Sequence, residues 1–195
     1  LELKRKGVSI MEINVTPAQL AKYFDQTLLK AYVSDSDFKA FWEESDHYHF
    51  KTVMINSAPV KKCKEYLKNS DVLVGATIGF PLGQTTIEAK VFETKKAIED
   101  GADEIDFVYN IAELKSRNIS FVEREMQEIV NVCRAHNKVV KVIFENCYLT
   151  QDEKKILCEI AMKADPDFIK TSTGFGTPAP GVAVGATVAD VKLMK

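Results

Sequence analysis

The feature that most constrains this fold is a repeated alternation between short apolar runs and segments with helical start signals. Most of the runs are continuously apolar rather than alternating, which is typical of strands in a parallel sheet covered on both faces. Because strand, helix and strand in this rhythm form right-handed βαβ units, the sequence predicts an α/β fold. Strands are expected at 52–56, 72–80, 104–110, 139–145 and 167–173, with a further short strand at 25–30.

Helix starts between these runs carry the capping-box pattern, in which Ser or Thr is followed three residues later by Glu or Gln. The pattern occurs at Thr85, Ser120 and Thr150, and Thr16 before Pro17 predicts a helix near the N-terminus. No linker or composition shift divides the 195 residues. We therefore expect a single domain over 1–195, with 1–23 as a helical lead-in.

Parallel sheets form either open doubly wound layers or closed barrels, and polar residues at the strand ends distinguish the two. A dinucleotide-binding layer would carry GxGxxG after a strand, and the sequence has no such motif. Polar residues instead recur at the carboxyl ends of several expected strands, as they do in barrel enzymes. The sequence thus favours a TIM-barrel type of fold.

Two lysines stand out because each lies within an apolar strand run, Lys141 in "VVKVIFE" and Lys170 in "DFIKTST". Burial and a like-charged neighbour both favour the neutral form of a lysine. A neutral lysine near pH 7 is a nucleophile that forms a Schiff base with a carbonyl carbon. Asp106, on a neighbouring expected strand, can accept and return the protons. This set is typical of a metal-independent aldolase.

The same lysines also have a purely structural interpretation. A lysine near a strand end commonly extends to solvent or pairs with a carboxylate, and Glu145 and Asp106 are available as partners. For one lysine alone this interpretation is favoured, whereas two lysines and an aspartate on successive strands favour a site. Glu104, close behind Gly101, is interpreted as a strand-entry residue.

Composition excludes several other classes of function. A net charge of −2 gives no reason to expect nucleic acid or an anionic membrane as partner, and no apolar run approaches the ~20 residues that span a bilayer. The four cysteines show no metal-ligand spacing, so they predict reduced thiols in a cytoplasmic protein without a metal site.

Five strings together resemble the deoxyribose-phosphate aldolase family, over the chain from about Phe24 onward. The resemblance implies a (β/α)8 barrel that needs no cofactor. It also implies a class I aldolase that reversibly cleaves 2-deoxy-D-ribose 5-phosphate into acetaldehyde and D-glyceraldehyde 3-phosphate. The strings, in chain order, are "DQTLLK", "IGFPLGQTTIEAK", "GADEIDFVYN", "KVIFE" and "DFIKTSTGF".

By this resemblance, Lys141 is the Schiff-base nucleophile and Lys170 is the second cation that lowers its pKa. Asp106 is the proton-transfer carboxylate. Asp25 matches an aspartate that pairs with the second lysine and supports the proton relay. The family thus implies four catalytic residues at the ends of four different strands.

The resemblance also implies a small-molecule substrate, a sugar phosphate or aldehyde, and a homodimer is a further expectation. Nucleic acid and membrane are not expected as partners. The expected substrate-binding residues are Met54, Asn56, Thr171, Ser172 and Gly174.

Measured against an eight-stranded barrel, the sequence accounts for about six of eight βα units, where a typical barrel needs roughly 250 residues. The expected domain is therefore an incomplete TIM barrel. Three interpretations stay open: an active aldolase for the phosphorylated sugar, a truncated and catalytically defective remnant or fragment, and a related Schiff-base aldolase with another aldehyde acceptor.

Overall fold

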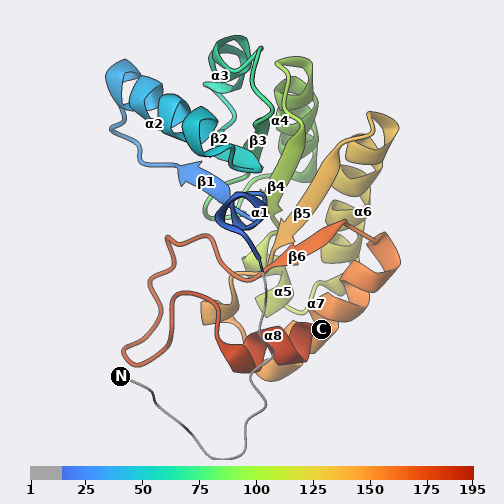
Figure 1. The fold of residues 1–195 in the computed structure, drawn as a ribbon. Coiled ribbons are helices and arrows are strands. Elements are labelled where there is room, and N and C mark those ends of the chain that lie inside the picture. The colour runs from blue at the N-terminus through green and yellow to red at the C-terminus, as the bar shows by residue number, and fades with distance from the viewer. Residues whose placement is uncertain (1–14) are drawn as a thin grey trace, which may run out of the picture.

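A curled sheet of six parallel strands forms the centre of the computed structural model, which describes residues 15–195 (Figure 1). Strand order follows the chain from β1 to β6, and every neighbouring pair is parallel. The predicted α/β barrel-type fold with six βα units is confirmed. The strands are β1 Asp25–Leu28, β2 Thr52–Asn56, β3 Leu73–Ile78, β4 Glu104–Val108, β5 Val139–Ile143 and β6 Phe168–Lys170.

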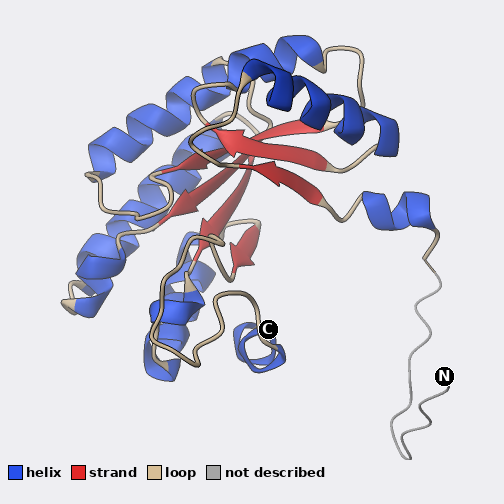
Figure 2. Ribbon diagram, turned by 90° about the vertical axis from the view of Figure 1, so that its left-hand side faces the viewer, coloured by secondary structure: helices blue, strands red, loops and turns tan. Residues whose placement is uncertain are grey.

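Helices α2 to α7 lie on the outer side of this sheet, whereas the short α1 lies on its open side (Figure 1 and Figure 2). The predicted lead-in over 1–23 extends in part beyond the described residues, and within them it contains α1. No helix of residues 15–195 is long and apolar enough to cross a membrane. The helices are α1 Pro17–Ala21, α2 Asp35–Tyr48, α3 Val60–Tyr66, α4 Ile87–Glu99, α5 Ile111–Lys115, α6 Ile119–Ala135, α7 Gln151–Ala164 and α8 Val188–Met194, with a 3-10 turn at Asn146–Tyr148.

The capping patterns located some helix starts and missed others. Thr16 and Thr150 form complete capping boxes at α1 and α7, as predicted. Helix α4 is capped by Thr86, one residue later than expected, and α6 begins after Asn118, so Ser120 lies inside that helix. At α4 two adjacent threonines can both act as caps, so the pattern alone did not choose between them. At α6 the side chain of Asn118 makes no capping hydrogen bond, so that helix starts without the predicted device.

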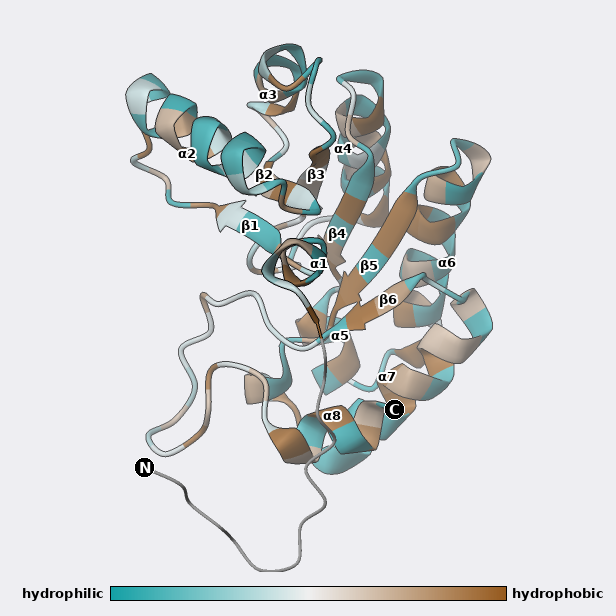
Figure 3. Ribbon diagram, in the orientation of Figure 1, coloured by the Kyte–Doolittle hydropathy of each residue, from teal (hydrophilic) through white to brown (hydrophobic). Residues whose placement is uncertain are grey.

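Side chains alternate between the two faces of each strand, and the two faces differ in character. Outward-facing residues such as Val53, Ile105 and Val142 are fully buried in one apolar cluster. The inner face carries the polar residues, and Figure 3 shows hydrophilic stretches interrupting the hydrophobic strands β4 and β5. The apolar core therefore lies between the sheet and the helices, and the inner face carries the polar residues of the candidate site.

A buried ion pair fixes the ends of β3 and β4 to the helix layer. Lys90 on α4 and Glu125 on α6 are both fully buried, with 2.6 Å between Nζ and Oε1. Lys90 also donates to the carbonyls of Gly83 and Val108, and Glu125 accepts from the backbone N–H of Asn110. Through these bonds one lysine holds the loop after β3 against the end of β4.

We predict that Lys90→Met destabilises the protein by about 3–5 kcal/mol, because it leaves the Glu125 carboxylate buried without a counter-ion. The measurement is the free energy of unfolding in urea. The matched control is Lys163→Met, because Lys163 pairs with Glu123 at the surface, and it should change stability little. Equal effects of the two substitutions would contradict the prediction.

Candidate active site

The register of the sheet places a row of side chains across five strands on its inner face. Asn56 pairs with Thr77, Thr77 with Asp106, Asp106 with Lys141, and Lys141 with Phe168. Directly paired residues in neighbouring strands point to the same face. The predicted amine and the predicted proton-transfer carboxylate are therefore direct neighbours.

Four residues that the sequence singled out form one charged cluster on this face. The Lys141 Nζ lies 2.5 Å from Oδ2 of Asp25 and 3.6 Å from Oδ1 of Asp106. The Lys170 Nζ lies 2.6 Å from Oδ2 of Asp106. Asp106 thus lies between the two lysines, which are on the same side of the sheet as predicted.

The Lys141–Asp25 contact requires the sheet to curl. These residues lie on β5 and β1, and four interstrand spacings of about 4.8 Å would separate the two strands in a flat sheet. Only a strongly curved sheet brings an ammonium and a carboxylate from these strands into direct contact. A half-open pocket of about 530 Å³ lies beside this contact, and it is lined by Lys22, Tyr23, Asp25, Lys51, Glu104, Val139, Lys141, Phe168, Ile169 and Lys170.

Glu104 is a member of the cluster that sequence reasoning missed. It precedes Asp106 by two residues on β4, is 3% exposed, and has Oε2 at 2.7 Å from the Lys141 Nζ. Its interpretation as a mere strand-entry residue was wrong. Alternation along β4 puts Glu104 on the same face as Asp106, and that was the signal that could have identified it.

Electrostatics in the cluster differ from the expectation that Lys141 stays neutral. Burial acts to lower the pKa of Lys141, but the carboxylates of Asp106, Asp25 and Glu104 outweigh it and raise that pKa above its ordinary value of 10.5. Burial likewise raises the pKa of Asp106, against the opposing effect of Lys170 and Lys141. The predicted lowering of the Lys141 pKa is therefore wrong for this structure, because three carboxylates face two ammonium groups.

The predicted partner of Asp25 was also wrong. Asp25 was expected to pair with Lys170, but it accepts a hydrogen bond from Lys141 instead. Lys170 donates to Asp106. The register separates the two lysines along the strands. Lys170 lies opposite Ile143, which is the next inward-facing position after Lys141 on β5, so the two ammonium groups meet different carboxylates.

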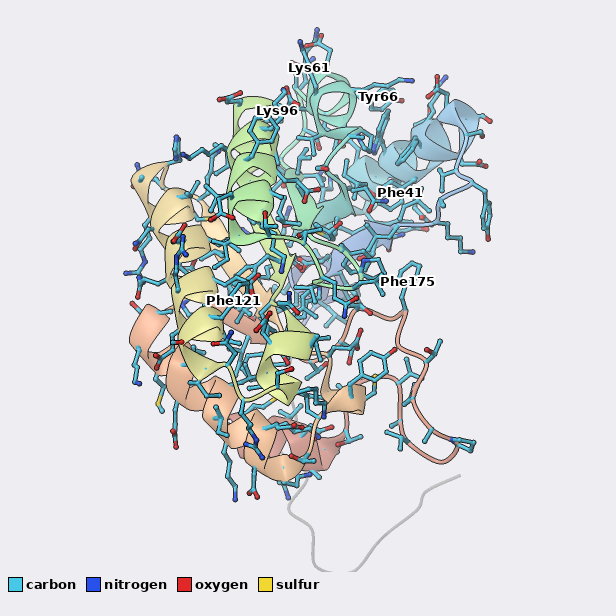
Figure 4. The ribbon with its side chains drawn as sticks, turned by 180° about the vertical axis from the view of Figure 1, so that it is seen from behind. Phe41, Lys61, Tyr66, Lys96, Phe121 and Phe175 are labelled. Carbon is cyan, nitrogen blue, oxygen red and sulfur yellow. The ribbon has the colours of Figure 1, made fainter. Side chains whose placement is uncertain are left out.

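Loops join the carboxyl ends of three strands over this face. Strand β5 ends before Glu145, which has a φ of 55° and so does not continue the alternation that was predicted to place it beside Lys141. Its carboxylate instead accepts from the N–H of Thr173 at 3.2 Å, in the loop after β6. Phe175, labelled in Figure 4, belongs to that loop. Its ring packs edge-on against that of Phe80, which follows β3, with 5.3 Å between ring centroids.

The five residues expected to bind substrate lie in two places. Met54 is fully buried on β2, and Asn56 ends that strand in the row described above. Strand β6 is shorter than predicted, so Thr171, Ser172 and Gly174 belong to the loop at its carboxyl end. None of the five lines the pocket around Lys141, and their contacts with a substrate stay predictions.

Metal ligation was not expected from the cysteine spacing. Among residues 15–195, no group of three or more His, Cys, Asp or Glu side chains is arranged to hold a metal ion. The chemistry of the cluster described here is that of two amines and three carboxylates.

Comparison with known proteins assigns the chain to a protein family. Residues 19–195 match the family described as "DeoC/LacD family aldolase". The chain belongs to this aldolase family. A deoxyribose-phosphate aldolase of Lactobacillus acidophilus is 53% identical over 175 residues, which are 90% of this chain and 71% of the relative. One from Thermococcus kodakarensis is 49% identical over 91% of this chain and 77% of the relative.

Solved structures of the family share the fold. A putative deoxyribose-phosphate aldolase from Coccidioides immitis superposes with a TM-score of 0.85 at 30% identity, covering 92% of this chain and 68% of that one. A structure described as "QR15, an Aldolase" gives 0.80 at 37% identity, covering 89% and 74%. The predicted resemblance and the predicted barrel type are thereby confirmed for an aldolase-family chain shorter than these relatives.

The raised pKa of Lys141 predicts how stability depends on alkaline pH. A group whose pKa is higher in the folded state stabilises the fold fully below its unfolded value of 10.5, and this stabilisation is lost as pH rises above it. The free energy of unfolding of the wild type minus that of Lys141→Met should therefore fall as pH rises above about 10. Urea unfolding at several pH values from about 9 upward measures the difference, and a difference that rises with pH over this range would contradict the assignment.

Proposed function

We propose that this chain is a class I deoxyribose-phosphate aldolase, which cleaves 2-deoxy-D-ribose 5-phosphate reversibly into acetaldehyde and D-glyceraldehyde 3-phosphate. The observation that carries the proposal is the buried row in which Asp106 lies between Lys141 and Lys170. Family membership and the names of the curated relatives support the same reaction.

Lys141 is the nucleophile in this proposal, and Asp106 prepares it. At rest Lys141 is an ammonium, so a proton must leave before the nitrogen can attack the carbonyl carbon C1. Asp106 is suited to accept it, because the carboxylate lies 3.6 Å away and burial raises its pKa. The neutral amine adds to C1 to give a carbinolamine, and Asp106 returns the proton to the departing hydroxyl, which leaves as water.

The resulting iminium drives the cleavage of the carbon–carbon bond. Asp106, which is again a carboxylate after water has left, accepts the proton of the C3 hydroxyl and can return it at C2 after cleavage. The C2–C3 bond breaks, and its electron pair moves through C1 to the iminium nitrogen. This step releases D-glyceraldehyde 3-phosphate and leaves an enamine. Protonation at C2 and addition of water to C1 then release acetaldehyde and regenerate the Lys141 amine.

Lys170 and Asp25, the other two residues of the predicted set, stabilise the charges on Asp106 and Lys141 during the reaction. Lys170 stays paired with Asp106 and stabilises its carboxylate form. Asp25 accepts a hydrogen bond from the reactive nitrogen and stabilises both the ammonium and the iminium. We assign substrate contacts at the carboxyl ends of the strands to Met54, Asn56, Thr171, Ser172 and Gly174.

We also propose a cytoplasmic homodimer. Free thiols at all four cysteines support a reducing compartment. An aldolase of this family from Aeropyrum pernix is described as having a "unique tetrameric structure", which supports self-association as a property of relatives. Sedimentation equilibrium should give twice the 21.9 kDa mass of one chain, and a mass of 21.9 kDa would exclude the dimer.

We predict that Lys141→Ala abolishes the covalent adduct formed with acetaldehyde and borohydride, because Lys141 is the nucleophile in this proposal and Lys170, the other amine of the cluster, stays paired with Asp106. Peptide mapping by mass spectrometry should find one ethyl group on Lys141 of the wild type, in large excess over an exposed lysine such as Lys163. Cleavage of the phosphorylated sugar should fall by at least about 10³-fold.

Lys170→Leu distinguishes the roles of the two lysines. It should keep the adduct on Lys141 but shift its formation to higher pH, because the Asp106 charge then acts on Lys141 without compensation. An adduct on Lys170 in the wild type would reverse the assignment of the two lysines. An adduct on Lys141 without turnover of the sugar phosphate would favour a catalytically defective remnant. Equal rates on phosphorylated and unphosphorylated substrates would favour a Schiff-base aldolase that uses another aldehyde acceptor.

A further inference from the structure

We propose that Glu145 is a positioning residue, which holds the loop after β6, residues 171–177, in the place where that loop binds substrate. The inference rests on the proposed aldolase function and deepens it. It holds whichever lysine of the inner face forms the Schiff base. Its basis is a buried carboxylate that accepts hydrogen bonds from this loop.

Three donors converge on the Glu145 carboxylate. The backbone nitrogen of Thr173 lies 3.2 Å from Oε1 and 3.3 Å from Oε2, and the Thr173 hydroxyl donates to Oε2. The Cys147 thiol donates to Oε1 at 3.7 Å. Glu145 is 1% exposed and forms no ion pair within residues 15–195, so these bonds compensate for the burial of its charge.

The backbone at Glu145 gives the carboxylate to the loop rather than to the charged cluster. Its φ of 55° lies in the left-handed region, which is unfavourable for a residue with a side chain. Non-glycine residues stay in this region only where surrounding contacts impose it, and they occur often at active sites and ligand clamps. Continued alternation would have placed Glu145 on the face of Lys141. The turn ends β5 instead, and the carboxylate meets Thr173.

The loop depends on the turn after β5 for its position. Among the described residues, the hydrogen bonds that join 171–177 to the rest of the chain all end on residues 145–148. One of them joins the N–H of Asn146 to the carbonyl of Thr171 at 2.8 Å. Of these four residues only Glu145 carries a charge, and charge-assisted bonds are the stronger ones. Its carboxylate is therefore the main anchor of the loop.

Gly176 brings the far part of the loop close to the same carboxylate. A Cβ added at Gly176 would lie 2.5 Å from the Cys147 Sγ and 3.4 Å from Oε1 of Glu145. Active sites of barrel enzymes are built from the loops at the carboxyl ends of the strands. A carboxylate that contacts this loop at two places thus determines where its expected substrate contacts lie.

Substitution of Glu145 by Gln tests the role, because the amide keeps the size but replaces one acceptor oxygen with an NH₂ donor. Three donors then face one acceptor, and the loop should loosen. The first readout is hydrogen–deuterium exchange of residues 171–177, followed by mass spectrometry. We expect exchange about tenfold faster in the variant than in the wild type.

The second readout separates positioning from stability. The KM for 2-deoxy-D-ribose 5-phosphate should rise about tenfold in Glu145→Gln, and kcat should change by less than about threefold. Trapping of acetaldehyde with borohydride, summed over Lys141 and Lys170, should stay at the wild-type level, because acetaldehyde lacks the phosphorylated part of the substrate. A role in stability alone would lower kcat and trapping together and leave KM unchanged.

Two substitutions of Thr173 test the same contact from the loop side. Thr173→Val removes the hydroxyl donor and should raise KM, whereas Thr173→Ser keeps the donor and should restore it. This pair decides the matter if Glu145→Gln does not fold. The matched control is Glu153→Gln, because Glu153 is buried but pairs with Lys115, and Gln can keep its capping role at the start of α7. Its loop exchange and KM should equal those of the wild type.

Outcomes for Glu145 and for the proposed function are separable. Wild-type loop exchange and wild-type KM in folded Glu145→Gln would overturn the positioning role and leave the aldolase proposal standing. A fall in kcat and trapping at unchanged KM would overturn the positioning role as well. A wild type that does not cleave the sugar phosphate would overturn the aldolase proposal, and loop exchange, which needs no turnover, would still decide whether Glu145 holds the loop.

Discussion

The contact between the Lys141 ammonium and the Asp25 carboxylate joins the two sides of the curled sheet, and much of the structure follows from it. It links β5 to β1 across the inner face at 2.5 Å, with Lys141 almost completely buried. A buried charge is tolerated only when it is paired, so this contact and the facing carboxylates of Asp106 and Glu104 stabilise both the curvature and the site. The same contact holds Lys141, the nucleophile in the proposed function.

Charge balance in the cluster changes the account of how the amine becomes reactive. A lysine kept neutral by a second lysine was expected, but the carboxylates outnumber the amines and keep Lys141 protonated at rest. The proposed mechanism therefore needs a proton acceptor rather than a permanently neutral amine, and it assigns this role to Asp106, which lies between the two lysines. In the proposed reaction, the same excess of negative charge stabilises the iminium.

The two faces of the sheet have different roles: the outer face packs in the apolar core, and the inner face carries the charged cluster. Apolar residues of the outer face pack against the helices, and the buried Lys90–Glu125 pair anchors the loop after β3. Above the inner face, the loop after β6 reaches the other strand ends through Thr173 and Phe175. Substitutions on the outer face should thus act mainly on stability, and those on the inner row mainly on catalysis.

The sequence by itself determined the strand–helix order, the parallel sheet and the two inward lysines, because continuous apolar runs and capping residues are local signals. Alternation also places Asp106 and Lys141 on inward positions once the strands are known. Only the tertiary structure decided that Asp25 pairs with Lys141, that Glu104 joins the cluster, and that Glu145 leaves the strand. These depend on the curvature and register of the sheet and on a left-handed backbone turn, which arise from contacts between residues far apart in the chain.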